Sequence, residues 1–94
     1  MKIKLADNHC HILKEYFDNP SETIKKLVEE GKLEYIVSMG LNYETNRENL
    51  VLSKEVGDRD FFKIGLGFHP GEVISIGKHS DQELARILEQ IDEN

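Results

Sequence analysis

Two histidines with the spacing of a metal-ligand pair follow a short apolar segment near the start of the chain. The stretch "KIKLADNHCHI" at residues 2–12 contains His9 and His11, two of the four histidines in 94 residues. In extended backbone, residues two apart point the same way, and their Cα atoms lie roughly 6.5 Å apart. Two imidazoles at that separation can converge on one divalent cation with bonds of about 2.1 Å. The pair therefore predicts a metal site with His9 and His11 as ligands.

Simpler explanations exist for an isolated pair of this kind, since two such histidines can arise by chance or be satisfied within a polar cluster. Their position at the end of a strand favours the metal site, because chemistry in parallel α/β folds gathers at the carboxyl ends of strands. Asp7 shares their side of the strand and could orient a ring or complete the shell. Cys10 points the other way, and we expect it to pack as a small hydrophobe.

A third histidine, His69, lies in the stretch "GFHPGE" at residues 67–72, after another apolar run. Pro70 restricts the preceding residue to extended backbone, so His69 can be read simply as a turn residue. The functional alternative is a contact to phosphate or substrate at the same edge of the sheet. His69 is therefore a candidate substrate-binding residue, and the sequence pattern leaves both interpretations open.

Strand-like and helical segments alternate along the chain, and they must position these histidines. Apolar, β-prone runs cover residues 3–7, 34–39 and 61–68. Caps predict helices between Asn19 and Gly31 and between Asn42 and Gly57, and a capping box at Ser80–Glu83 begins a third, with Leu84, Ile87, Leu88 and Ile91 on one face. The order βαβαβα predicts an α/β fold with parallel strands and right-handed crossovers. Crossovers of one hand place the helices on one side, so either the chain reverses or the sheet is an arc of a barrel with an open inner face.

Composition narrows the function classes. Twelve Lys and Arg against 18 Asp and Glu give a net charge of −6, which argues against a broad electrostatic grip on nucleic acid or membrane. A bound metal can still supply local positive charge for a nucleic-acid enzyme. The single cysteine excludes an intrachain disulfide and fits a reducing compartment. No apolar run approaches the ~20 residues of a membrane span, and no secretory signal is visible, so we expect a cytoplasmic protein without a membrane partner.

With the segments placed, three motifs resemble a known family. The stretch "DNHCHI" at 7–12 is similar to the D-x-H-x-H opening of metal-dependent hydrolases with an amidohydrolase-like (β/α)₈ barrel. The run from Tyr16 to Glu55 and the stretch "GLGFHPGE" at 65–72 resemble the TatD-type deoxyribonucleases. The resemblance covers nearly the whole chain in order.

The resemblance implies a divalent-metal-dependent phosphodiester hydrolase with exonuclease-like DNase activity, acting on DNA or on small phosphoesters. His9 and His11 match the family's first metal-ligand pair, and His69 matches the histidine of its G-x-H-P turn. The implied cofactor is Mg²⁺, Mn²⁺ or Zn²⁺, with two ions in the complete family site.

A TIM-barrel-like hydrolase of this kind has eight βα units and about 250 residues. About three units are present here, so we expect residues 1–94 to form a single partial (β/α) barrel domain, corresponding to the N-terminal portion of the family. The later ligands of the family have no matching positions. The alternative is a non-catalytic barrel fragment that self-associates or is complemented by another chain covering the open sheet.

Overall fold

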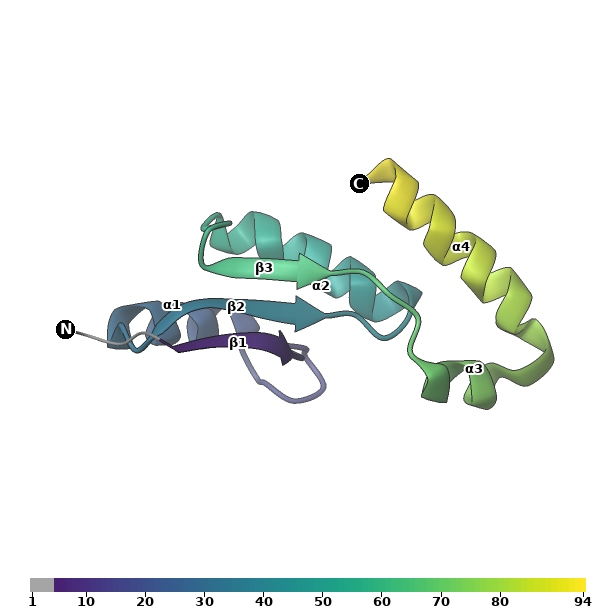
Figure 1. The fold of residues 1–94 in the computed structure, drawn as a ribbon, viewed down its shortest axis with the longest axis horizontal. Helices are drawn as coiled ribbons and strands as arrows, with labels where there is room; N and C mark the ends of the chain where they lie inside the picture. Colours follow the sequence, from purple (N-terminus) through teal and green to yellow (C-terminus); the bar gives the residue numbers. More distant parts are fainter. Residues whose placement is uncertain (1–4) are drawn as a thin grey trace.

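The chain folds as parallel strand–helix units, as the computed structural model shows for the backbone of residues 5–94 and for the side chains outside positions 73, 75, 76 and 78. One sheet has the strand order β1-β2-β3, and both strand pairs are parallel (Figure 1). The elements in chain order are β1 (Leu5–Cys10), α1 (Pro20–Glu30), β2 (Leu33–Met39), α2 (Tyr43–Val56), β3 (Phe62–Gly65), α3 (Pro70–Ile76), a 3-10 turn (Gly77–His79) and α4 (Ser80–Glu93). The predicted α/β class and parallel pairing are confirmed.

The first strand runs further along the chain than the apolar pattern predicts. The predicted strand covers residues 3–7, of which 3 and 4 lie outside the described residues, whereas β1 continues to Cys10. It continues because β2 offers partners up to the pair Cys10↔Ser38, although the register shifts between Asp7 and Cys10. His9 is therefore part of β1, and His11 is the first residue after it.

The third strand is shorter than predicted, and a short helix follows it. The apolar run at 61–68 predicts a long strand, but β3 covers only Phe62–Gly65. Its partner β2 ends at Met39, which is paired with Gly65, so the ladder has no further residues to pair. The loop then enters α3 at Pro70, a first-turn position that proline tolerates, where the sequence predicts a turn.

The caps of the first two helices are confirmed. The Asn19 side chain accepts a hydrogen bond from the Glu22 backbone at the start of α1, and Asn42 forms a capping box with Thr45 at the start of α2. Gly31 and Gly57 end these helices with φ of 67° and 74°, a left-handed conformation that glycine adopts without steric cost.

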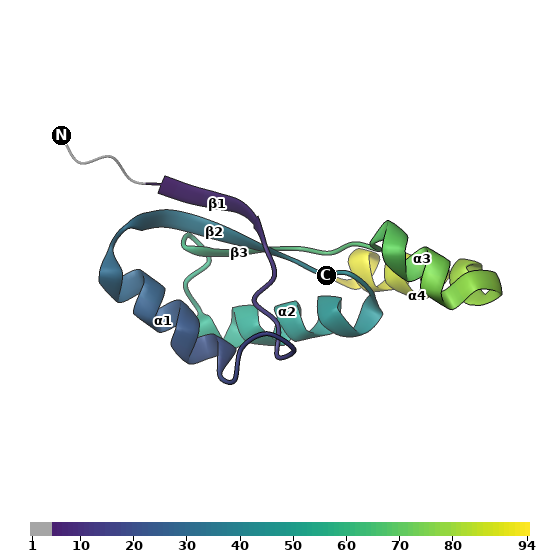
Figure 2. The ribbon, with the colours of Figure 1, turned by 90° about the horizontal axis from the view of Figure 1, so that it is seen from below.

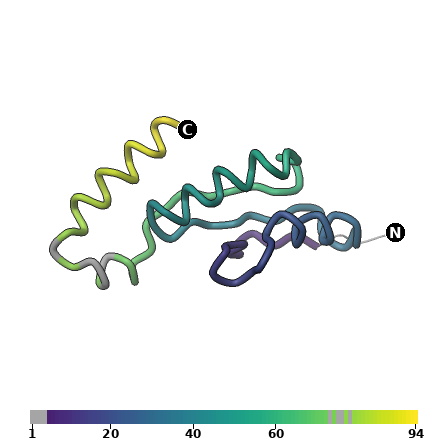
Figure 3. The backbone as a smooth tube through the Cα atoms, turned by 180° about the vertical axis from the view of Figure 1, so that it is seen from behind, coloured from purple at the N-terminus to yellow at the C-terminus, as the bar shows by residue number. Residues whose placement is uncertain are grey.

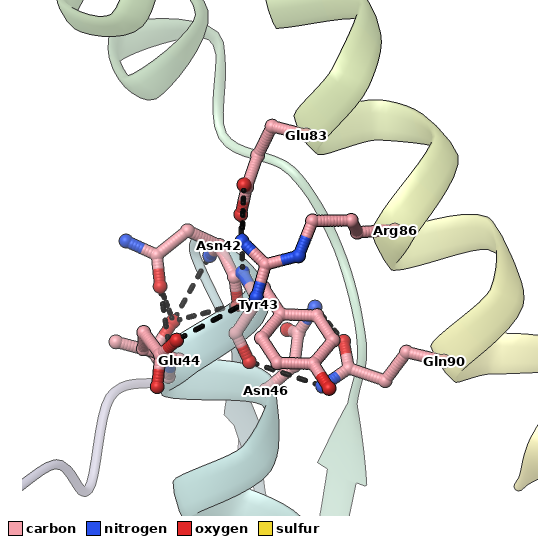
Figure 4. Close-up of polar contacts among 8 residues, drawn as sticks. Asn42, Tyr43, Glu44, Asn46, Glu83, Arg86 and Gln90 are labelled. Atoms are coloured by element: carbon pink, nitrogen blue, oxygen red, sulfur yellow. Dashed lines mark hydrogen bonds and ion pairs between the residues drawn. The ribbon is translucent and has the colours of Figure 1, made fainter.

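The predicted capping box of α4 is wrong. Ser80 is the first helical residue, His79 occupies the cap position, and no side chain caps this end. Glu83 instead reaches the start of α2, where its carboxylate accepts a hydrogen bond from the Tyr43 backbone N–H at 3.3 Å. The same carboxylate pairs with Arg86 at 3.0 Å, so the acidic residue joins two helices rather than closing one (Figure 4).

Helices α1 and α2 cover the same face of the sheet and lie side by side (Figures 2 and 3). The apolar core lies between these helices and the strands. Its buried members are Ile12, Ile24, Ile36, Leu52, Phe61 and Phe62. One covered face agrees with the right-handed crossovers that the sequence predicts.

The opposite face of the sheet has no helix over it within residues 5–94 (Figure 2). Along β2, half-buried Tyr35, Val37 and Met39 alternate with Ile36 and Ser38, which are buried toward the helices. Of the two predicted alternatives, a reversal of the chain or a sheet with an open face, the described part of the chain has the open face. None of the helices described is long and apolar enough to cross a membrane.

Candidate metal and phosphate site at the strand ends

The candidate site lies at the carboxyl ends of the three strands, the edge that faces α3 in Figure 1. Here the rings of His9 and His11 approach each other with centroids 5.1 Å apart and planes 82° apart. The two imidazoles therefore share one side of the strand end, as the period of extended backbone predicts. His9 is exposed and His11 is half-buried, so the pair lies at the boundary between protein and solvent.

A backbone carbonyl fixes the orientation of the His11 ring. Its Nδ1 lies 2.9 Å from the carbonyl oxygen of Met39, the last residue of β2. A carbonyl oxygen can only accept, so Nδ1 carries the proton, and Nε2 of the neutral ring keeps its lone pair. A histidine that donates one ring N–H to a backbone carbonyl while presenting the other nitrogen is arranged as metal-ligating histidines are.

Asp7 and Cys10 lie close to the two histidines in the sequence and bind backbone groups of β1 and β2. The Asp7 carboxylate accepts a hydrogen bond from the backbone N–H of His9 at 3.0 Å and so holds the strand end. The Cys10 thiol donates a hydrogen bond to the Val37 carbonyl at 3.3 Å, and the side chain packs against the core, as predicted. Burial and, to a smaller extent, the charge of Asp7 raise the pKa of this thiol from 9.0 to about 11. The thiol is therefore protonated at neutral pH.

The loop after β3 places His69 at the same edge. The His69 backbone N–H donates to the carbonyl of Leu41 at 2.8 Å, which ties this loop to the end of β2. The exposed His69 ring accepts a hydrogen bond at Nδ1 from the Gly71 N–H at 3.0 Å. Nδ1 is therefore unprotonated, and Nε2 carries a proton that can be donated to an anionic oxygen.

The end of β2 is the shared support of both candidates. Met39 holds the His11 ring, and Leu41, two residues later, holds the His69 backbone. Because β2 lies between β1 and β3, the two histidines reach this segment from its two sides. The fourth histidine, His79, is exposed at the start of α4, as expected for a solvated residue.

The donor set at this edge fits part of a metal site. Two imidazoles on one side of a strand end, one with its tautomer set by a carbonyl, are suitable nitrogen ligands for a divalent cation. Among the described residues, no group of three or more His, Cys, Asp or Glu side chains converges on a common point. To hold an ion, His9 and His11 would therefore need further ligands besides their own two side chains.

The sequence pattern does not predict the buried polar residues that support the site. Ser38, Asn46, Asn49 and Gln90 are all at most 5% exposed, and every buried polar side-chain atom described has a hydrogen-bond partner. The available signal was the poor apolar pattern of α2, in which asparagines occupy helix positions that normally carry apolar residues.

Parallel strands with helices on one face and polar side chains at the carboxyl edge place the chain in the class of parallel α/β proteins. Residues 6–94 match the TatD related DNase family, and the chain belongs to this family of nuclease-type hydrolases. A comparison with curated proteins found no match.

Proposed function

We propose that this chain acts in divalent-metal-dependent hydrolysis of phosphodiester bonds in DNA, with His9 and His11 as metal ligands and His69 as a phosphate contact. The observation that carries the proposal is the His11 ring, whose Nδ1 is held by the Met39 carbonyl at 2.9 Å beside the His9 ring. Membership of the TatD related DNase family supports the substrate class.

The two kinds of histidine are suited to different tasks. In its neutral form the His11 ring keeps a lone pair on Nε2, which suits a metal ligand, whereas His69 has a proton on Nε2, which suits a hydrogen-bond donor to a phosphate oxygen. A bound divalent ion supplies Lewis-acid polarisation of the phosphate and activates water at neutral pH. Mg²⁺, Mn²⁺ and Zn²⁺ are the candidate ions, and a small phosphoester is the alternative substrate.

The test is degradation of a linear DNA by the purified chain with added Mg²⁺ or Mn²⁺, beside the double variant His9→Ala/His11→Ala. We expect metal-stimulated degradation that the double variant loses, together with loss of Mn²⁺ binding measured by calorimetry. The variant His79→Ala is the matched control, because it removes an exposed histidine outside the site. Degradation that the double variant retains would show that these two histidines are not the metal ligands.

A non-catalytic role, in which the chain associates with itself or with a complementing chain, is the second candidate function. The observation that favours it is a row of exposed apolar side chains on α4, where Leu84, Leu88 and Ile91 are 42%, 53% and 41% exposed. Absence of DNA degradation by a chain that still binds Mn²⁺ through His9 and His11 would support this second role.

A further inference from the structure

Two asparagines of α2 are buried where a helix that covers a sheet normally carries apolar residues. Asn46 and Asn49 lie three residues apart on one face of the helix, and both are 0% exposed. Burying an amide is costly unless its hydrogen bonds are satisfied, and in both residues the oxygen and the nitrogen have partners. Apart from Gln90 on α4, those partners lie on two different segments of the candidate site.

Asn46 clamps the loop that carries His69. Its Oδ1 accepts from the Gly67 backbone N–H at 3.0 Å, and its Nδ2 donates to the Gly67 carbonyl at 3.0 Å. The second Nδ2 hydrogen goes to Oε1 of Gln90 on α4 at 3.0 Å, and Gln90 in turn donates to the Tyr43 carbonyl at 3.0 Å (Figure 4). The Asn46 amide therefore has one orientation, and it fixes both backbone groups of a residue two positions before His69.

Asn49 clamps the end of β2 and, through it, the segment that carries His11. Its Oδ1 accepts from the Ser38 hydroxyl at 2.9 Å, and its Nδ2 donates to the Ser38 carbonyl at 3.2 Å. Because the Ser38 hydroxyl donates its hydrogen to Asn49, its oxygen is the acceptor in the bond from the Ile12 backbone N–H at 3.0 Å. Ile12 directly follows His11, and Ser38 directly precedes Met39, whose carbonyl orients the His11 ring.

We propose that Asn46 and Asn49 are positioning residues, each with its hydrogen bonds directed to one half of the site: Asn46 to the loop of the phosphate contact His69 and Asn49 to the strand end that holds the metal ligand His11. The inference rests on the proposed function for what the histidines bind, but the placement of the histidines can be tested without it. A purely structural role would predict that loss of either asparagine disturbs both halves alike.

The experiment compares Asn46→Ala with Asn49→Ala, and each variant is the matched control for the other. The two residues share type, helix and full burial, so we expect similar losses of thermal stability. The ring ¹⁵N chemical shifts of the histidines, measured by long-range ¹H–¹⁵N NMR, should separate the variants. We expect Asn46→Ala to shift the His69 ring nitrogens and leave those of His11, and Asn49→Ala to do the reverse.

Binding measurements test in a second way whether Asn49 supports the metal ligand and Asn46 supports the phosphate contact. Loss of a residue that orients a metal ligand typically weakens metal binding about 10–100-fold. We therefore expect Asn49→Ala to weaken Zn²⁺ binding by at least about tenfold, while Asn46→Ala weakens binding of a 5′-phosphorylated oligothymidylate. If the unmodified chain binds neither probe, the proposed function fails, and the ¹⁵N shifts still decide whether the asparagines divide the site.

Milder variants keep the test decisive if either alanine variant does not fold. Gln90→Met keeps the size of the side chain but removes the acceptor that orients Asn46, and Ser38→Ala removes the hydroxyl between Asn49 and Ile12. We expect the first to move only the His69 shifts and the second only the His11 shifts. Equal changes at both histidines, or none at either, would overturn the inference.

Discussion

At the scale of single residues, backbone partners give the two histidines opposite tautomers. His11 has its proton on Nδ1 because it faces the carbonyl of Met39, whereas His69 has its proton on Nε2 because Nδ1 faces the Gly71 N–H. Residue type alone would make the two rings equivalent. The difference suits His11 to metal ligation and His69 to hydrogen-bond donation, which is the chemical basis of the proposed function.

Cys10 offers a prediction that depends on a single pKa. Burial and the nearby Asp7 raise the pKa of the folded thiol from 9.0 to about 11. Near pH 8, the folded thiol therefore contains roughly 100-fold less thiolate than a free one, and the thiolate is the species that reacts. We expect iodoacetamide to modify the native chain at least about tenfold more slowly than the urea-unfolded chain, measured by mass spectrometry.

The same shift predicts how stability depends on pH. Between pH 9.0 and about 11 the unfolded thiol loses its proton while the folded thiol keeps it, so the free energy of unfolding falls as the pH rises. Below this window the stabilisation is fully present. Cys10→Ser should remove this part of the loss, and urea unfolding of both chains at about pH 8 and about pH 10 measures it. Parallel losses in the two chains would contradict the prediction.

At the scale of elements, local signals predicted most of the fold. Helices α1 and α2 have the expected caps because residues such as Asn19 and Asn42 act within three positions of themselves. The predicted capping box of α4 is wrong because Glu83 instead accepts a hydrogen bond from Tyr43, 40 residues away. Only a tertiary contact decides between these two partners. No apolar pattern marks the buried face of α2, because Asn46 and Asn49 share it with Leu52.

In the candidate site, too, local sequence patterns predict some features, whereas others depend on tertiary contacts. The facing arrangement of His9 and His11 follows from the period of extended backbone, so the sequence predicted it. The support of His11 by Met39 spans 28 residues and depends on which strands are neighbours, so no local pattern contains it. The clamp of Asn46 on Gly67 spans 21 residues and was missed for the same reason.

The close packing of α2 on the end of β2 predicts a sensitive glycine. A Cβ added at Gly40 would lie 1.8 Å from Oδ1 of Asn46 and 3.0 Å from its Cα, so helix backbone as well as side chain would have to move. We expect Gly40→Ala to lower the free energy of unfolding by about 1–3 kcal/mol, the usual cost of overpacking. Chemical denaturation measures this change.

Gly67→Ala is the matched control for that variant. A Cβ at Gly67 would meet its nearest neighbour, the Gly40 carbonyl oxygen, at 3.5 Å, an ordinary contact. We expect the free energy of unfolding of this variant to lie within about 1 kcal/mol of that of the unmodified chain. Equal destabilisation by the two substitutions would show that the contact with Asn46 is not what requires glycine at position 40.

At the scale of the whole molecule, apolar surface remains uncovered in the described part of the chain. The radius of gyration is 14.6 Å, whereas a compact chain of this length is expected to have about 12 Å. Besides the open face of the sheet, α4 presents Leu84, Leu88 and Ile91 to solvent, while Ile87 on the same helix is buried. Apolar residues at this spacing form the stripe through which helices pack on one another.

We therefore expect copies of the chain to associate through this stripe of α4, and to do so more strongly in salt. Five acidic residues against one arginine on α4, and a net charge of −6 for the chain, oppose contact between copies at low ionic strength. Light scattering should show an apparent mass that rises with protein concentration and with added NaCl.

Leu88→Asp should abolish the rise, because it places a charge in the stripe at a position that is 53% exposed. Val51→Asp, at a similarly exposed position on α2 (49%), is the matched control and should associate like the unmodified chain. A monomer at every concentration and salt level would contradict the expectation, and equal effects of the two variants would place the contact elsewhere than α4.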